Sequence, residues 1–308
     1  MACLILAGGD ASRLGVSLPK GMFDPKIDGL KSIFELITIK IKTLNDLCVK
    51  EHPECPDIGR GRIVLVIMTN QESLHKITNF FKENNNFGYS TIVFFPQNHL
   101  PVADQSGKIM MRSANSILFA PNGNGAIFQS INGSSTFTKL TELGIEYLHI
   151  TGVDNLLNKW ADPNMLGVMV SKDCDIICKY SGKKHALERV GVYAYLNGMP
   201  YVIEYSIIGE TLAKKTNDKG ELLYNHSNLL NFMVRMSFLK DKILDEKNIN
   251  KLNQKYNVSI KDVRNFDLER SAEHDSKGVK FEIFIHECLS FCEPSKFVLI
   301  ECNRDHVE

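Results

Sequence analysis

A short apolar run at the start of the chain leads directly into a pair of glycines. Residues 1–7 (MACLILA) are followed by Gly8 and Gly9, and the cationic residues Arg13 and Lys20 come soon after. A continuous apolar run of this length is typical of a parallel strand that is buried on both faces. Because glycine lacks a Cβ, the turn after the strand can bring its backbone N–H groups close to a phosphate. The segment therefore predicts a loop that holds a nucleoside triphosphate.

The overall charge limits the class of ligand that the chain can bind. Its 308 residues include 36 basic and 36 acidic side chains, which give a formal net charge of zero. This balance argues against electrostatic binding of nucleic acid or of an anionic membrane. No apolar stretch of the sequence approaches the roughly 20 residues that a membrane span requires. We expect small anionic ligands that are bound by local basic loops.

The cysteines indicate the redox compartment. The eight cysteines contain no C-x-x-C pair, and the spacing that zinc sites favour is missing. Free or buried thiols are therefore the better interpretation, and we expect a reducing cytoplasm.

Apolar segments rich in Ile, Val and Phe alternate with segments of helical periodicity. Strands are expected at 63–68, 91–95, 147–150 and 176–180, and helices at 32–47 and 71–84. Strands separated by helices indicate a mostly parallel sheet with right-handed crossovers. The fold class of the chain is therefore expected to be α/β.

The second half of the chain has a different pattern. Residues 190–204 contain two β-rich runs around Asn197-Gly198, which is the pattern of a hairpin. The apolar segment 228–239 and the charged amphipathic segment 240–263 are both predicted to be helical. We expect a single domain over 1–308, with a nucleotide-binding half at about 1–185 and a second half at about 186–308.

The N-terminal motif resembles the signature of the eukaryotic UDP-N-acetylglucosamine (UDP-N-acetylhexosamine) pyrophosphorylases. These proteins carry L-A-G-G-x-G-T-R-L-G followed by P-K-G, and this chain has LAGGDASRLG followed by SLPKGMFD. Ala11 and Ser12 depart from the family pattern, and Ala11 adds a Cβ where the loop can require a positive φ. A lone Gly-Gly pair would favour an ordinary turn. The Arg-Leu-Gly and Pro-Lys-Gly elements at family spacing favour the resemblance instead.

Three further motifs match those of the family in order along the chain. Gln97 lies in FFPQ where the family has F-F-x-Q, and Asp154 lies in the V-D-N motif. Gly123 and Asn124 lie in PNGNGA where the family has P-D-G-N-G-G. Taken alone, Gln97 is a solvated loop residue, Asp154 is a helix cap, and 120–126 is a surface turn.

The remaining motifs lie in the second half. Gly191 and Glu204 match the family's V-G-V and V-E-Y-S pair, and Asn228 matches the last residue of N-A-G-N. Phe284 matches the first aromatic of G-I-K-M-E-x-F-V-F-D, but His286 stands where the family has its second phenylalanine. Since a methyl-bearing acetamide prefers an apolar wall, His286 weakens the case for an N-acetyl sugar but does not remove it. An exposed hairpin carboxylate is the simpler interpretation of Glu204.

The resemblance implies a fold and a reaction. The fold is a Rossmann-like nucleotidyltransferase fold of the glycosyltransferase-A type, with a mixed, mostly parallel sheet flanked by helices and added β-hairpin structure. The reaction converts UTP and N-acetylglucosamine 1-phosphate to UDP-N-acetylglucosamine and pyrophosphate. UTP, the UDP-sugar and a hexosamine 1-phosphate are the implied ligands, and no nucleic-acid or membrane partner is expected. The resemblance makes 1–308 a single catalytic domain whose half at about 186–308 binds the sugar.

The resemblance also implies roles for individual residues. Arg13 and Lys20 are expected to be catalytic through their charges, and Asp154 is expected to bind Mg²⁺, or Mn²⁺ in its place. The backbone of the glycine loop and Gln97 are expected to read the uridine. The full set of expected substrate-binding residues is Leu6, Ala7, Gly8, Gly9, Gln97, Gly123, Asn124, Gly191, Glu204, Asn228, Phe284 and His286.

Two alternatives to this reaction stay open. His286 favours a UDP-sugar pyrophosphorylase that acts on plain hexose 1-phosphates. Family members have a segment before the glycine loop and a C-terminal region with an L-K-N motif, whose lysine holds phosphates. We expect both to be absent or truncated here, which favours a catalytically weak UDP-sugar-binding paralogue.

Overall fold

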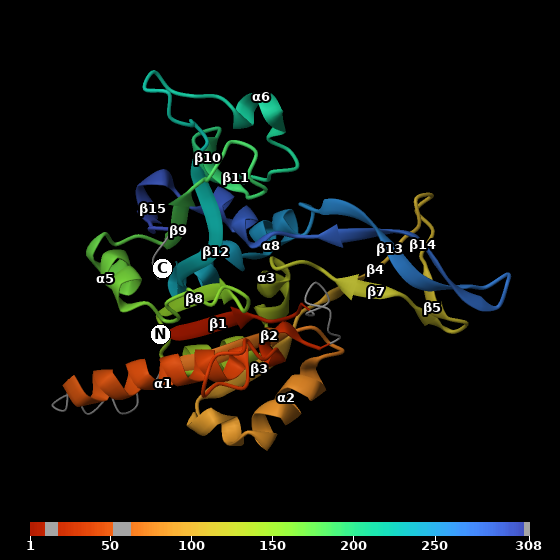
Figure 1. Cartoon of the computed structure of the whole chain (residues 1–308), viewed down its shortest axis with the longest axis horizontal. Helices are drawn as coiled ribbons and strands as arrows, with labels where there is room; N and C mark the ends of the chain where they lie inside the picture. Colours follow the sequence, from red (N-terminus) through yellow and green to blue (C-terminus); the bar gives the residue numbers. More distant parts are fainter. Residues whose placement is uncertain (10–17, 52–62, 305–308) are drawn as a thin grey trace.

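The centre of the molecule is a nine-stranded sheet. The computed structural model describes residues 1–9, 18–51 and 63–304, and every structural statement below refers to them. The strands of this sheet are β1 (Ala2–Leu6), β2 (Val64–Thr69), β3 (Ile92–Pro96), β8 (Tyr147–Gly152), β9 (Ile176–Gly182), β10 (Val192–Leu196), β11 (Met199–Ile203), β12 (His226–Arg235) and β15 (Phe297–Glu301). Their order is β11-β10-β12-β8-β1-β2-β3, and β9 lies between β12 and β15 on a branch of the sheet (Figure 1).

Most of these strands run in one direction. Strands β8, β1, β2 and β3 pair in parallel, and so do β9 and β15. Strand β12 is antiparallel to β8, β9 and β10, and β11 is antiparallel to β10. Only β11 and β12 therefore oppose the other described strands of this sheet. The predicted mixed, mostly parallel α/β architecture is confirmed.

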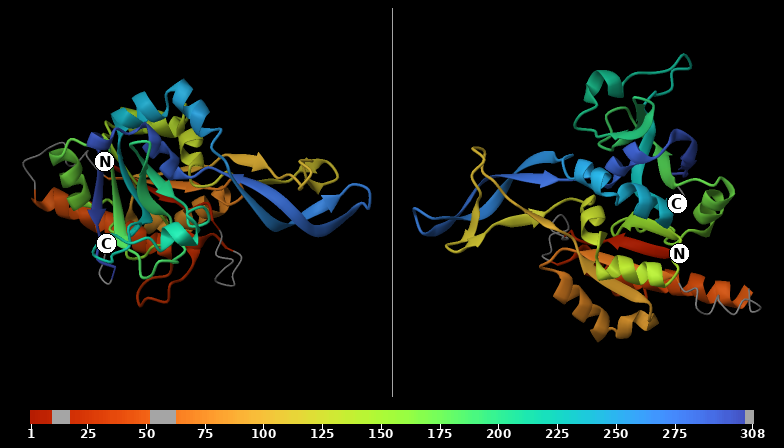
Figure 2. Two further views of the ribbon diagram at one scale, coloured as in Figure 1. Left: turned by 90° about the horizontal axis from the view of Figure 1, so that it is seen from above. Right: turned by 180° about the vertical axis from the view of Figure 1, so that it is seen from behind.

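Helices cover both faces of the sheet. The α-helices of the described residues are α1 (Ile33–Glu51), α2 (Leu74–Glu83), α3 (Ala126–Ile131), α4 (Ser135–Glu142), α5 (Pro163–Ser171), α6 (Gly209–Ala213), α7 (Met236–Phe238) and α8 (Glu246–Leu252). Alternate residues of β1 point to opposite faces. Ile5 joins Phe34 of α1 and Phe81 of α2 in one apolar cluster, whereas Leu4 joins Phe128 of α3 in another. Figure 2 shows the sheet between these two layers.

A long β-hairpin and two short strands project from this body. Strands β13 (Asn257–Asp267) and β14 (Ala272–Glu282) form the hairpin, and β5 (Met111–Ser113) and β6 (Ser116–Ile117) extend it to a four-stranded sheet. We call these four strands the arm. Strands β4 (His99–Pro101) and β7 (Phe119–Pro121) pair with each other near its base. All three views show the arm extending away from the central sheet (Figures 1 and 2).

The other elements of the described chain are short. They are the 3₁₀ helices η2 (Lys20–Met22), η3 (Asn85–Gly88), η5 (Ile285–Phe291) and η6 (Pro294–Lys296), together with the π-helical turn η4 (Leu239–Ile243). No helix within the described ranges is long and apolar enough to cross a membrane. No disulfide joins the cysteines in these ranges, and Cys55 lies outside them.

Several predicted elements are confirmed. The four predicted strands correspond to β2, β3, β8 and β9, and the two predicted helices correspond to α1 and α2. The hairpin at 190–204 corresponds to β10 and β11. Its turn residues Asn197 and Gly198 have φ values of 52° and 79°, and two successive positive values are the requirement of a type I′ turn.

Two helix predictions are wrong. Most of the segment 228–239 belongs to β12, and helix α7 begins only at Met236. Strand β12 lies in the sheet interior between β8 and β9, so Phe232, Met233 and Val234 are all buried. A short apolar run buried on both faces has no strand alternation and resembles a buried helix. The segment 240–263 contains α8 but ends in β13, whose exposed and half-buried residues give no clear strand signal.

Candidate active site

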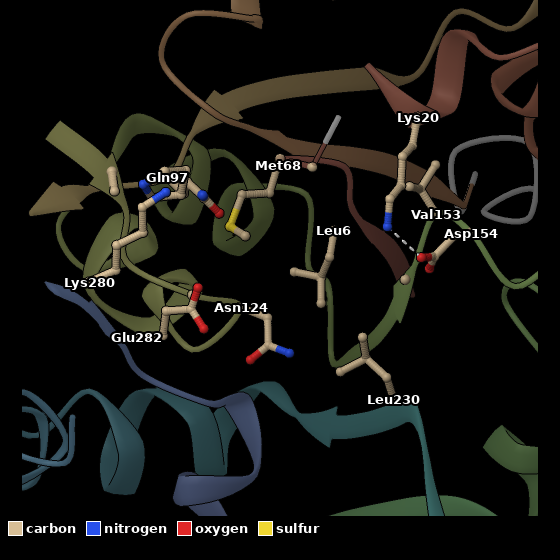
Figure 3. A pocket seen from close by; sticks show the side chains of 16 residues that line it. Leu6, Lys20, Met68, Gln97, Asn124, Val153, Asp154, Leu230, Lys280 and Glu282 are labelled. Atoms are coloured by element: carbon tan, nitrogen blue, oxygen red, sulfur yellow. Dashed lines mark hydrogen bonds and ion pairs between the residues drawn. The ribbon is translucent and has the colours of Figure 1, made fainter. Parts of the chain in front are cut away.

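The carboxyl ends of the parallel strands surround a cavity of about 330 Å³. The residues that follow β1, β3 and β8 all line it: Gly8 and Gly9, then Gln97, then Asp154. The register explains this convergence, because Leu6 at the end of β1 pairs with Met68 of β2 and with Gly152 of β8. We call this space the edge cavity, and Figure 3 shows its side chains.

The glycine turn and Gln97 lie against each other. The backbone N–H of Gln97 donates to the carbonyl of Thr69 over 2.7 Å, and the Asn70 side chain donates to the carbonyl of Gly8 over 3.0 Å. A Cβ on Gly8 would come within 3.0 Å of the Gln97 amide group, so the glycine permits this close approach. Gln97 is only 6% exposed, and its interpretation as a solvated loop residue is therefore wrong.

Lys20 and Asp154 form an ion pair at one side of the edge cavity. The Lys20 Nζ atom lies 2.7 Å from Asp154 Oδ2 (Figure 3). The backbone N–H of Lys20 donates to the carbonyl of Gly9, which ties the lysine to the glycine turn. Asp154 caps no helix, since the next helix is α5 and Asp162 caps it. The structure thus brings the expected catalytic lysine and the expected metal ligand together, whereas Arg13 lies outside the described residues.

The turn at 122–125 packs against the end of β14. Gly123 has a φ of 79°, and a Cβ there would lie 2.5 Å from the carbonyl oxygen of Ile283. The Asn124 Oδ1 atom accepts a hydrogen bond of 2.8 Å from the backbone N–H of Ile285. Because Asn122 is fully buried and both Gly123 and Asn124 line the edge cavity, this segment is more than a surface turn.

A second group of expected residues gathers beside β10, β11 and β12. Glu204 Oε1 lies 3.7 Å from His286 Nδ1, and a Cβ on Gly191 would come within 3.0 Å of the same carboxylate oxygen. The backbone N–H of Asn228 donates to the carbonyl of Gly191 over 2.8 Å. The rings of Phe284 and His286 lie 5.3 Å apart. These five expected substrate-binding residues therefore lie together, and Glu204 is not an exposed hairpin carboxylate.

This second group adjoins the edge cavity. Leu230 lines the cavity, and its backbone N–H donates to Asn228 Oδ1 over 3.0 Å. Asn124 provides another link, because its partner Ile285 lies between Phe284 and His286 in the chain. A ligand that extends from Gln97 past Asp154 would therefore end near Glu204.

Burial sets the charge state of the second group. Burial lowers the pKa of His286 to about 4, with a smaller contribution from the nearby ammonium of Lys255. Burial also raises the pKa of Glu204, and the neighbouring carboxylate of Glu287 adds to that effect. The imidazole is therefore uncharged at neutral pH. The 3.7 Å contact between Glu204 and His286 is consequently not an ion pair under these conditions.

The sequence prediction did not include some of the residues that line the site. Lys280 and Glu282 both line the edge cavity, and they share one face of β14 because they are two positions apart. They lie within the motif that yielded Phe284 and His286. Of the expected nucleotide contacts at the strand end, Leu6 lines the cavity. The side chain of Ala7 instead packs in the core, and its backbone N–H donates to the carbonyl of Met68.

Comparisons with known proteins agree with this geometry. The model of the UTP–glucose-1-phosphate uridylyltransferase family matches residues 1–284. The chain is 31% identical to UDP-N-acetylhexosamine pyrophosphorylase-like protein 1 of Xenopus tropicalis, over 99% of the chain and 58% of that protein. It is 30% identical to UDP-N-acetylglucosamine pyrophosphorylase of Saccharomyces cerevisiae, over 99% of the chain and 62% of that protein. The chain thus spans about three fifths of the length of these curated relatives.

Solved structures give the same result. A putative UDP-N-acetylglucosamine pyrophosphorylase from Entamoeba histolytica superposes with a TM-score of 0.84 at 31% identity, over 98% of this chain and 74% of that one. The uridine diphosphate N-acetylglucosamine pyrophosphorylase from Trypanosoma brucei, solved with an inhibitor, also gives 0.84, at 28% identity over 99% of this chain and 60% of that one. The sequence resemblance and the nucleotidyltransferase fold are confirmed.

Stability should fall in acid partly through His286. Its pKa lies below the ordinary value of 6.5, so the unfolded chain binds more protons than the folded chain between pH 6.5 and about 4. The contribution of each such histidine to the free energy of unfolding is thus fully present above pH 6.5. It is lost towards pH 4, by up to about 1.4 kcal/mol per pH unit. His149 is also buried, with a pKa lowered to about 4, and adds a similar loss.

Urea unfolding of the parent chain and of His286→Phe at several pH values measures this effect. The variant should show the shallower decline between pH 6.5 and 5, whatever its stability at pH 7. An equally steep decline in both proteins would show that His286 does not remain neutral in the folded state.

Proposed function

The chain belongs to the UTP–glucose-1-phosphate uridylyltransferase family, and from this membership we propose that it transfers a uridylyl group from UTP to a sugar 1-phosphate. The proposed acceptor is N-acetylglucosamine 1-phosphate, and the products are UDP-N-acetylglucosamine and pyrophosphate. The observation that carries the proposal is the convergence of Gly8, Gln97, Lys20 and Asp154 on one cavity at the sheet edge.

The glycine turn and Gln97 suit a uracil ring. The Gln97 side chain carries one acceptor and two donors, so it can pair with neighbouring carbonyl and N–H groups on the edge of the base. Since Gly8 has no Cβ, the base can approach the backbone beside this amide. Buried polar groups that must be satisfied by a ligand discriminate strongly against ligands that lack the matching groups.

The chemistry requires relief of charge rather than a protein base. An oxygen of the sugar phosphate attacks the α-phosphorus of UTP, and the bond from that phosphorus to the bridging oxygen breaks as pyrophosphate leaves. The attacking group is already anionic at neutral pH. Positioning and electrostatic stabilisation therefore supply most of the catalysis. Lys20 is the proposed source of positive charge within the described residues, and Arg13 is proposed to act with it.

Asp154 is the proposed metal ligand. Its carboxylate oxygens are the donors that Mg²⁺ prefers, and Mn²⁺ accepts the same donors. No cluster of three or more metal-binding side chains occurs within the described ranges, which fits a metal that is held largely by nucleotide phosphates. A bound Mg²⁺ ion would reduce the negative charge on the phosphates.

The group around Glu204 is the proposed sugar site. Glu204 and Asn228 offer oxygen and nitrogen atoms to sugar hydroxyls, and Phe284 provides an apolar surface for the acetamide methyl. His286 makes one wall of this site polar, which is the specific observation in favour of a plain hexose 1-phosphate.

The cytoplasm is the proposed compartment, because the cysteine pattern indicates free thiols. Residues 1–308 are proposed to act as one catalytic unit.

A coupled assay of pyrophosphate release tests the function. The assay contains UTP, Mg²⁺ and one of three acceptors: N-acetylglucosamine 1-phosphate, N-acetylgalactosamine 1-phosphate or glucose 1-phosphate. We expect the highest kcat/KM with an N-acetylated acceptor. A preference for glucose 1-phosphate that is reversed in His286→Phe would favour the second candidate. Release that is no faster than without enzyme for every acceptor would contradict the proposed activity.

Lys20→Ala should lower kcat far more than it weakens binding of the UDP-sugar. Electrostatic groups that act on the transition state contribute roughly 100-fold or more to kcat, so a loss of that order is expected. Lys26→Ala is the matched control, because Lys26 is largely exposed and pairs with Asp24 in the same loop region. Equal losses in turnover and in affinity for the UDP-sugar would show that Lys20 contributes only to binding.

A further inference from the structure

A second cavity of about 690 Å³ lies between the glycine turn and the arm. It shares Gly9, Lys20 and Lys280 with the edge cavity, so the two spaces are adjacent. Strand β5 contributes Arg112 to its lining, and strand β13 contributes Lys261. We call this second space the basic hollow.

The two cavities differ in charge. Lysines and carboxylates balance in the lining of the edge cavity, where Lys20 and Lys280 face Asp154 and Glu282. The basic hollow has four cationic side chains and only one carboxylate, a net charge of +3 with histidine neutral. The four cations are Lys20, Lys280, Arg112 and Lys261, and the carboxylate is Glu72. Burial lowers the pKa of the lining residue His99, which favours the neutral ring.

Three of the four cations have a carboxylate within 4 Å, but only one of these carboxylates, Glu72, lines the hollow. Lys20 lies 2.7 Å from Asp154, which lines the edge cavity. Arg112 pairs with Glu72 at 2.8 Å, but both side chains are more than 60% exposed, and exposed pairs contribute little. Lys261 lies 3.6 Å from Glu282. Burial lowers the pKa of Lys280, and the positive charge of Lys261 lowers it further. An anion in the hollow would relieve this repulsion.

The hairpin register places the two arm lysines on the same face. Lys280 pairs with Ser259, and Lys261 pairs with Gly278, so Lys261 and Lys280 project to one side of the β13–β14 ribbon. The opposite face carries charges that are already paired. There Lys277 lies 2.9 Å from Asp262, and Arg264 lies 3.2 Å from Glu273. The face towards the hollow therefore has two lysines near one carboxylate, Glu282, so positive charge is in excess there.

We propose that the basic hollow binds the pyrophosphate portion of the nucleotide and the released pyrophosphate, with Arg112 and Lys261 as phosphate contacts. The inference rests on the proposed function, because it assumes that the nucleoside occupies the edge cavity. The triphosphate would then pass Lys20, which lines both spaces, and its outer phosphates would enter the region of excess positive charge. When the bond from the α-phosphorus to the bridging oxygen breaks, that oxygen leaves with its electron pair as part of the pyrophosphate.

Calorimetric titration with inorganic pyrophosphate and Mg²⁺ tests this proposal without any turnover. The double variant Arg112→Gln/Lys261→Gln should bind pyrophosphate at least about tenfold more weakly, since hydrogen bonds between charged groups are stronger than neutral ones. Its affinity for UMP, which carries only the α-phosphate, should stay unchanged. The matched control Arg264→Gln/Lys277→Gln removes the same residue types from the opposite face and should bind pyrophosphate like the parent chain.

A third variant tests the proposal through the direction in which it changes pyrophosphate affinity. Glu72→Gln removes the carboxylate that pairs with Arg112, so it should tighten pyrophosphate binding by a few-fold. Unchanged or weaker binding in Glu72→Gln would contradict the proposal, and so would equal weakening in the two double variants. Failure of the parent chain to bind pyrophosphate would also overturn it. If the chain binds pyrophosphate with the expected variant pattern but catalyses no uridylyl transfer, the result would support phosphate binding in the basic hollow. It would contradict the proposed function.

Discussion

The site depends on one constraint: four parallel strands have their carboxyl ends side by side at the same edge of the sheet. Strands β1, β2 and β8 end in register at Leu6, Met68 and Gly152, and β3 continues the same edge beside β2. Because parallel strands direct their following loops to one edge, segments far apart in the sequence must meet there. The ion pair between Lys20 and Asp154, 134 positions apart, is the clearest result. A shift in strand register would separate these two charges.

The distribution of polar groups along this edge suits a nucleotide sugar. A buried amide lies beside the glycine turn, an ion pair follows, and a group of neutral and acidic side chains lies near β10, β11 and β12. The arm adds a positively charged space on the outer side of the glycine turn. A base, a phosphate chain and a sugar require these environments in that order. On the proposed function, one continuous surface would hold both substrates and separate them from the leaving pyrophosphate.

Much of the fold and of the site could be predicted from the sequence. Gly8, Gln97 and Asp154 follow strands whose apolar patterns are clear, so their place at the sheet edge was predictable. Strand β12 was mistaken for a helix, because residues buried on both faces lack alternation. The arm was missed for the opposite reason. Its strands are largely exposed, and their charged residues resemble those of a solvated helix.

The basic hollow shows another limit of the sequence. Arg112 and Lys261 are separated by 149 positions (112 to 261), and neither belongs to a recognisable motif. Only the pairing of β5 with β13 brings their strands together. Charge that is collected from distant strands leaves no local pattern. By contrast, the glycine turn is local and could be recognised from ten residues.

Manganese binding tests the central claim most directly. Asp154 lies 2.7 Å from Lys20, and no cluster of three or more metal-binding side chains occurs in the described part of the chain. Electron paramagnetic resonance of Mn²⁺ should therefore detect little binding to the protein alone and clear binding when UTP is added. This nucleotide-dependent signal should be lost in Asp154→Asn. Equally tight binding without UTP, or an unchanged signal in Asp154→Asn, would contradict the site described at the sheet edge.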